Sequence, residues 1–159
     1  MELALEKFLH PSAQYPQAPS PAKPDAGSPD SKLTISVVYT SVDSTLTALR
    51  AAGSLASRLN AEIALLVPQI VPHPLPLESP PVLIDWNERR LKVIAEQSSV
   101  DTKVCLYLCR DRLATLISVL KPHSIVVIGG LKKWWPTKDK KLARQLRHAG
   151  HEVILAETR

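Results

Sequence analysis

Apolar residues follow two different spacings along the chain after residue 32. Five short apolar runs, separated by polar or turn-forming residues, have the length and composition of buried β-strands. They are Leu33–Tyr39, Ala61–Val67, Lys103–Leu108, Ser124–Ile128 and Glu152–Ala156. Between them, apolar residues recur every three or four positions, which predicts four amphipathic helices. Five strands that alternate with four helices are typical of an α/β fold, a doubly wound five-stranded parallel sheet with helices on both faces.

The predicted helices begin at residues whose side chains can accept hydrogen bonds from free backbone N–H groups. We expect the N-caps at Asp43 or Ser44, at Asp85 (with Glu88 completing a capping box), at Asp111 and at Thr137. Pro68 is expected to end the second strand. Gly150 is expected to follow the end of the last helix.

Proline divides the chain into two parts. Six of the fourteen prolines lie before residue 32, and six more lie between Pro68 and Pro81. The first group predicts a proline-rich N-terminal tail or linker over residues 1–32, and the second predicts a stiff loop after the second strand. Residues 33–159 are then expected to form one α/β domain.

Composition excludes several classes of protein. The net charge of the chain is +5. No apolar run approaches the roughly 20 residues that a helix needs to span a bilayer. The first ten residues lack the basic start of a signal peptide, so we expect a cytoplasmic protein with no membrane partner. Cys105 and Cys109 lie on one predicted strand at a separation of about 13 Å, too far for a disulfide, and are expected to be buried thiols.

Two loops are the candidate ligand-binding segments. A doubly wound sheet binds ligands beyond the carboxyl ends of its strands, where the strand order reverses. The loop over residues 40–45 follows the first strand, and the loop over residues 129–137 follows the fourth. The second loop leads into a helix rich in lysine and arginine. Lysines beside a helix N-terminus could bind a phosphate, and the same charge suits an acidic protein partner.

Three stretches resemble the universal stress protein family. They are the loop and alanine-rich helix over residues 40–59, the Ser-Ile-Val-Val-Ile-Gly-Gly run at 124–130, and the Leu-Arg-His-Ala run at 146–149 with the apolar strand after it. The resemblance covers residues 33–158. It implies the strand order 3-2-1-4-5, a homodimer that pairs through Glu152–Ala156, and a role in the stress response.

The two loops depart from the pattern of nucleotide-binding members of that family. Those members usually carry an aspartate where this chain has Thr40, and their fourth strand is followed by G-x2-G-x9-G-[ST]. Gly129 and Gly130 begin that pattern here, but Leu-Lys-Lys-Trp-Trp-Pro follows, and the later Gly-Ser pair falls near Asp139 and Lys140. A phosphate loop needs glycine so that backbone N–H groups can approach the anion. We therefore expect a degenerate phosphate loop in which the usual ATP site is lost or rebuilt.

The leading prediction is a universal-stress-protein-like regulatory or interaction module that is not an enzyme and holds no metal or cofactor. The alternative is a protein that binds ATP or AMP at a rebuilt, lysine-assisted phosphate site. The candidate residues of such a site are Thr40, Ser41, Asp43, Val67, Gly129, Gly130, Lys132, Lys133, Thr137 and Lys140.

Two features leave further alternatives open. Tyr39–Thr45 is similar to the S-G-G-x-D-S-[T] loop of PP-loop ATP pyrophosphatases, although Thr40 and Ser41 occupy its glycine positions. Trp134 and Trp135 either plug the vacant crevice, cover an interface or stack on a ligand. We expect no nucleic-acid partner, because no recognised motif occurs and aromatic residues for base stacking are few.

Overall fold

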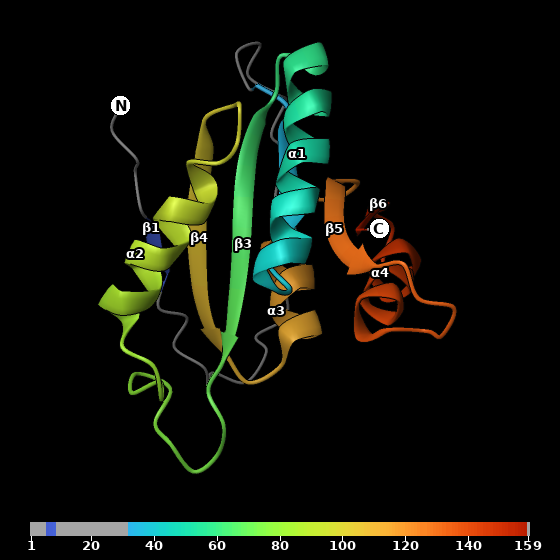
Figure 1. Cartoon of the computed structure of the whole chain (residues 1–159). Coiled ribbons are helices and arrows are strands. Elements are labelled where there is room, and N and C mark those ends of the chain that lie inside the picture. Colours follow the sequence, from blue (N-terminus) through green and yellow to red (C-terminus); the bar gives the residue numbers. More distant parts are fainter. Residues whose placement is uncertain (1–5, 9–31, 159) are drawn as a thin grey trace, which may run out of the picture.

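A parallel β-sheet forms the centre of the molecule. The computed structural model describes residues 6–8 and 32–158. Its strands are β1 (Glu6–Phe8), β2 (Thr34–Val38), β3 (Glu62–Ile70), β4 (Thr102–Cys109), β5 (Ile125–Leu131) and β6 (Glu152–Thr158). They are ordered β1-β4-β3-β2-β5-β6, and every neighbouring pair runs parallel (Figure 1).

The five strands expected from the sequence are β2 to β6, and they take the expected order 3-2-1-4-5. The sheet gains one further strand, because Glu6–Phe8 pairs with the free edge of β4 in the register Glu6↔Cys105. That strand falls within the segment expected to be a tail. The remainder of the expected tail, residues 1–5 and 9–31, lies outside the described residues.

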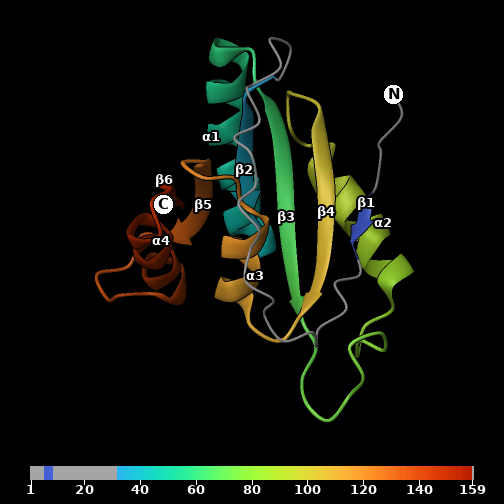
Figure 2. The ribbon, with the colours of Figure 1, turned by 180° about the vertical axis from the view of Figure 1, so that it is seen from behind.

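Four helices cover the two faces of the sheet, as the strand and helix alternation predicts. On one face lie α1 (Val42–Leu59) and α2 (Ile84–Ala95), and on the other lie α3 (Arg112–Val119) and α4 (Lys138–His148). Figures 1 and 2 show these two faces from opposite sides. The predicted α/β doubly wound architecture is confirmed.

Side chains of each strand alternate between two apolar cores. Along β2, Ile35 and Val37 enter the core under α1 and α2, while Val38 enters the core under α3 and α4. All three are completely buried. This alternation follows from the period of two along a strand, and burial on both faces explains why the strands read as continuous apolar runs.

The ends of two elements differ from the expectation. Helix α1 is capped by Ser41, whose hydroxyl accepts from the Ser44 N–H at 3.4 Å, and not by Asp43 or Ser44. Ser44 is 2% exposed, so its side chain packs against the sheet instead of capping. Helix α2 begins at Ile84 after Leu83, without a side-chain cap, and not at Asp85.

Other expected helix ends are confirmed. Asp111 caps α3 through the Ala114 N–H at 3.0 Å, and Thr137 caps α4. Gly150 follows the last helix with a φ of +94°, a conformation that glycine adopts without strain.

Pro68 lies inside β3, which runs on to Ile70, so the expectation that it ends the strand is wrong. The register pairs Pro68 with Tyr107 of β4. On the other side of β3, the Tyr39 N–H donates to the Leu66 carbonyl at 2.9 Å. A parallel ladder would continue with an N–H at position 68 that donates to the Tyr39 carbonyl. Proline has no N–H, and the ladder to β2 stops there without loss of the pairing to β4.

Candidate functional site

The two candidate loops meet at the carboxyl ends of β2 and β5. These strands are neighbours in the sheet, with Val38 beside Ile128. The chain leaves β2 into α1 on one face and leaves β5 into α4 on the other. This is the point of the sheet where the strand order reverses, and it is where doubly wound folds bind ligands.

Hydrogen bonds fasten the loop after β2 to the neighbouring strand and helix. The Thr40 hydroxyl donates to the Gly129 carbonyl at 3.2 Å, and the Thr40 N–H donates to the Thr45 hydroxyl at 3.2 Å. Ser41 caps α1, and Asp43 is exposed in its first turn. Polar groups of this loop are thus used for packing and capping, and no described contact of Asp43 suggests a role beyond the helix terminus.

At Gly129 the backbone of α1 lies very close to the sheet. A Cβ at this residue would lie 1.7 Å from the Ser44 carbonyl oxygen and 2.4 Å from its carbon. Only glycine allows this approach of helix backbone to strand. At Gly130 the space is different, because a Cβ would have Leu155 Cδ1 as its nearest neighbour at 3.5 Å. Gly129 is therefore needed for helix packing whatever else binds nearby.

The loop between β5 and α4 extends away from the sheet (Figures 1 and 2). Across residues 129–137 no residue has a positive φ, the conformation that forms an anion-binding nest from successive N–H groups. Trp134 is 92% exposed and Trp135 is 71% exposed, with ring centroids 5.4 Å apart in an edge-to-face contact. The two rings therefore do not plug the crevice, and that alternative is wrong.

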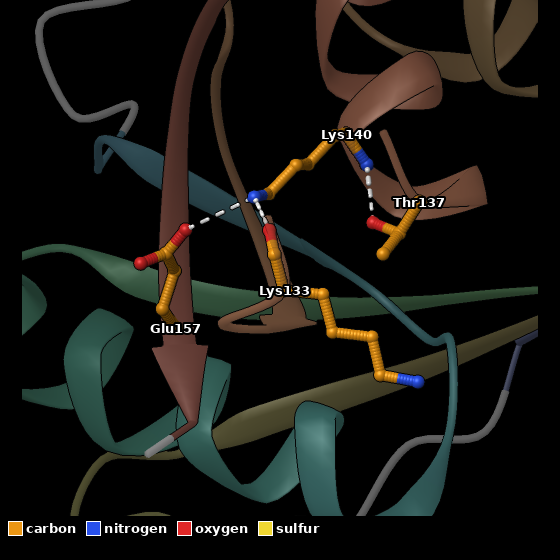
Figure 3. Close-up of polar contacts among 4 residues, drawn as sticks. All are labelled: Lys133, Thr137, Lys140 and Glu157. Atoms are coloured by element: carbon orange, nitrogen blue, oxygen red, sulfur yellow. Dashed lines mark hydrogen bonds and ion pairs between the residues drawn. The ribbon is translucent and has the colours of Figure 1, made fainter. Parts of the chain in front are cut away.

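Lys140 ties the base of this loop to the last strand. Its ammonium donates to the Lys133 carbonyl at 2.6 Å and lies 3.7 Å from the Glu157 carboxylate (Figure 3). Its backbone N–H donates to the Thr137 hydroxyl at 3.3 Å, which caps α4. The structure thus brings together three of the candidate residues, but in contacts with one another and with Glu157.

Arg112, which was not among the residues expected from the sequence, lies at the same edge of the sheet. Its Nη2 donates to the Tyr39 carbonyl at 2.7 Å. Pro68 has no N–H to donate to that carbonyl, so the Arg112 guanidinium takes the place of the missing backbone donor. Its Nε is buried and has no hydrogen-bond partner among the described residues. The only sequence signal was a basic residue directly after the Asp111 cap, which many exposed helices share.

Burial affects the ionisation of two neighbouring groups. It lowers the pKa of the Arg112 guanidinium, while the charge of Asp139 acts in the opposite direction. It also raises the pKa of the Cys109 thiol, against a hydrogen bond with Thr115 that lowers it. Cys105 and Cys109 are both buried free thiols, as expected.

The remaining candidates are scattered. Val67 is 6% exposed within β3 and packs in the core under α1 and α2. Lys132 and Lys133 are exposed on the loop after β5. Within residues 6–8 and 32–158, no group of His, Cys, Asp and Glu side chains could hold a metal ion, and no helix is long and apolar enough to cross a membrane.

Comparison with known proteins supports the fold. Neither the family models nor the curated protein sequences give a match. Among solved structures, a protein of the universal stress protein family from Burkholderia pseudomallei aligns with TM-score 0.52 and 19% identity, covering 77% of this chain and 93% of that one. A universal stress protein in complex with cAMP aligns with TM-score 0.52 and 15% identity over 80% and 98% of the two chains. One from Archaeoglobus fulgidus has TM-score 0.51 and 13% identity over 79% and 98%. The chain therefore has the fold of universal stress proteins.

Proposed function

We propose that this chain is a regulatory or interaction module on the universal stress protein fold that has lost the glycine-based phosphate site. As such a module, it would act in the cytoplasm through contacts with other macromolecules instead of through catalysis. The observation that supports this proposal is the backbone conformation of residues 129–137. Without a residue of positive φ, these amides do not form the concave nest that phosphate loops use.

Neighbouring groups add support for this loss. Gly129 is committed to the close contact with Ser44, and a phosphate has no room between them. Lys140, in the first turn of α4, already contacts the Lys133 carbonyl and the Glu157 carboxylate. A phosphate would have to displace both contacts to gain this charge.

A second candidate function is nucleotide binding without glycine. The solved neighbour in complex with cAMP shares the fold. In this chain the Nε of Arg112 is buried without a partner among the described residues, beside the carboxyl end of β2. A guanidinium with a free donor is suited to a phosphate, because it offers a planar, permanently charged fork.

Titration calorimetry with ATP, AMP and cAMP separates the two functions. The proposed module is expected to show no binding tighter than about 1 mM for any of the three. A micromolar dissociation constant that is lost in Arg112→Met, but kept in the matched variant Arg58→Met at the exposed last turn of α1, would establish the second candidate instead. Circular dichroism of each variant checks that the fold is retained.

We also propose that the module is a homodimer through the outer edge of β6. Among the described strands, β6 pairs only with β5, and on its other edge the Val153 carbonyl accepts from the Arg147 guanidinium at 2.9 Å without a neighbouring strand. Ile154 is 39% exposed on this strand. An edge strand of this kind favours pairing with a second copy across a two-fold axis.

A further inference from the structure

Two adjacent exposed tryptophans lie at the end of the loop between β5 and α4. We name this end the tryptophan tip, made of Leu131, Trp134, Trp135 and Pro136. Leu131 is 45% exposed, and the two tryptophans are 92% and 71% exposed. Two adjacent indole rings in water are unusual, and exposed apolar groups of this kind mark contact sites.

The tryptophan tip is held at both ends. On one side, the Lys133 N–H donates to the Leu131 carbonyl at 2.8 Å, and Lys140 holds the Lys133 carbonyl at 2.6 Å. On the other side, Thr137 is fixed as the N-cap of α4. The two rings also contact each other edge to face. A tip held in this way loses little conformational freedom when it meets a partner.

Lysines flank the tip on both sides in the sequence. Lys132, Lys133, Lys138 and Lys141 are exposed, and none of these side chains makes a hydrogen bond or an ion pair within residues 6–8 and 32–158. Of the acidic groups nearby, Glu157 is already paired with Lys140. The tip therefore presents two exposed indoles that exposed lysines flank in the sequence.

We propose that the tryptophan tip and its lysines dock on the surface of an anionic phospholipid bilayer. Indole rings concentrate at the boundary between headgroups and acyl chains, because one part of the ring is apolar and its N–H is polar. Lysines next to that boundary are attracted to anionic headgroups. The shape agrees, because a projecting tip suits a soft, flat surface (Figures 1 and 2).

Single-stranded nucleic acid fits the tip less well. Its binding sites combine a positive groove with aromatic faces on which successive bases stack. Here the planes of Trp134 and Trp135 meet at 62°, so two neighbouring stacked bases cannot lie flat on both rings. The expectation of no membrane partner rested on the lack of a spanning segment, and a peripheral contact does not need one.

Vesicle flotation of the full chain tests the proposal. Vesicles of phosphatidylcholine with about one third phosphatidylglycerol should carry the protein, and pure phosphatidylcholine vesicles should carry far less. The variant Lys132→Gln/Lys133→Gln should bind about 30-fold more weakly. Trp134→Ala/Trp135→Ala should weaken binding by about tenfold or more. The matched control is Trp86→Ala, which removes the 53% exposed tryptophan of α2 and should leave binding unchanged.

Tryptophan fluorescence gives a second measurement. In a Trp86→Phe background, emission from the tip should shift to shorter wavelength when anionic vesicles are added. No flotation with anionic vesicles, or equal loss in Trp86→Ala and in the tip variant, would overturn the proposal. Binding to a single-stranded RNA oligonucleotide without binding to vesicles would also overturn it, in favour of a nucleic-acid partner.

Discussion

Replacing Gly129 by alanine should strongly destabilise the fold, and the structure allows the magnitude to be worked out. The new Cβ would lie 1.7 Å from the Ser44 carbonyl oxygen, 2.4 Å from the carbonyl carbon and 3.0 Å from Cα. These are backbone atoms in the first turn of α1, so no side-chain rotation relieves the contact. To reach an ordinary separation, the helix must withdraw from β5 by about 1.5 Å, which also strains the Thr40–Gly129 hydrogen bond.

Overpacking of this kind costs about 3 kcal/mol, at the upper end of the usual range, because a helix must move as a unit. For a domain of this size that lowers the melting temperature by about 10 °C. Thermal unfolding followed by circular dichroism, with urea titration at fixed temperature, measures both quantities.

The matched control is the next residue. At Gly130 the nearest atom to a new Cβ is Leu155 Cδ1 at 3.5 Å, an ordinary contact. Gly130→Ala should therefore leave the free energy of unfolding unchanged or raise it by about 0.5 kcal/mol, because alanine restricts the unfolded chain. If the two variants had similar stability, Gly129 would not be a packing glycine. A role in ligand binding would then be the better explanation for it.

Three other outcomes are expected. Arg112→Ala should lower the free energy of unfolding by about 2 kcal/mol, because the Tyr39 carbonyl loses its donor. Pro68→Ala should reduce that loss, because alanine supplies an N–H to the same carbonyl. Additive effects of the two substitutions in a double-mutant cycle would contradict this exchange of donors. Light scattering should give about twice the 17.5 kDa chain mass, and Ile154→Lys should shift the protein towards the monomer; a wild-type monomer would remove the proposed β6 pairing. Burial raises the pKa of the Cys109 thiol, so the native state holds the thiol proton to higher pH than the unfolded state does. The free energy of unfolding should therefore fall as the pH rises above about 8.5. Urea titrations should show a smaller fall in Cys109→Ala.

The sequence was sufficient for the architecture because periodicity is a local property. The runs that became β2 to β6 are mostly apolar, as expected of strands covered by helices on both faces, and the helices carry apolar residues at three- and four-residue spacing. Caps with a single strong acceptor, Asp111 and Thr137, were also predictable. Ser41 was not, because several adjacent residues could cap equally well and only burial of Ser44 decides between them.

Contacts between distant residues account for what the sequence could not predict. Arg112 acts on Tyr39 across 73 positions, and its role depends on the register that places Pro68 where a donor is missing. Likewise, the sequence around Gly129 resembles a phosphate loop, and only the structure reveals that this glycine packs against α1. The sequence pattern placed Gly129 in a ligand site, whereas its contact with α1 explains this glycine through packing.

Contacts within the protein also bear on where this chain can meet a partner. At the carboxyl ends of β2 and β5, the Ser44 carbonyl occupies the space beside Gly129, and the Tyr39 carbonyl accepts from Arg112. The Lys140 ammonium contacts the Lys133 carbonyl and the Glu157 carboxylate. Each contact engages a protein group at the edge of the sheet where its strand order reverses. On the loop between β5 and α4, the side chains of Lys132 and Lys133 make no hydrogen bond or ion pair within the described residues, and the two tryptophans are largely exposed. If selection has kept this surface for binding, its partner should contact the projecting loop, and tip variants should lose function without losing stability.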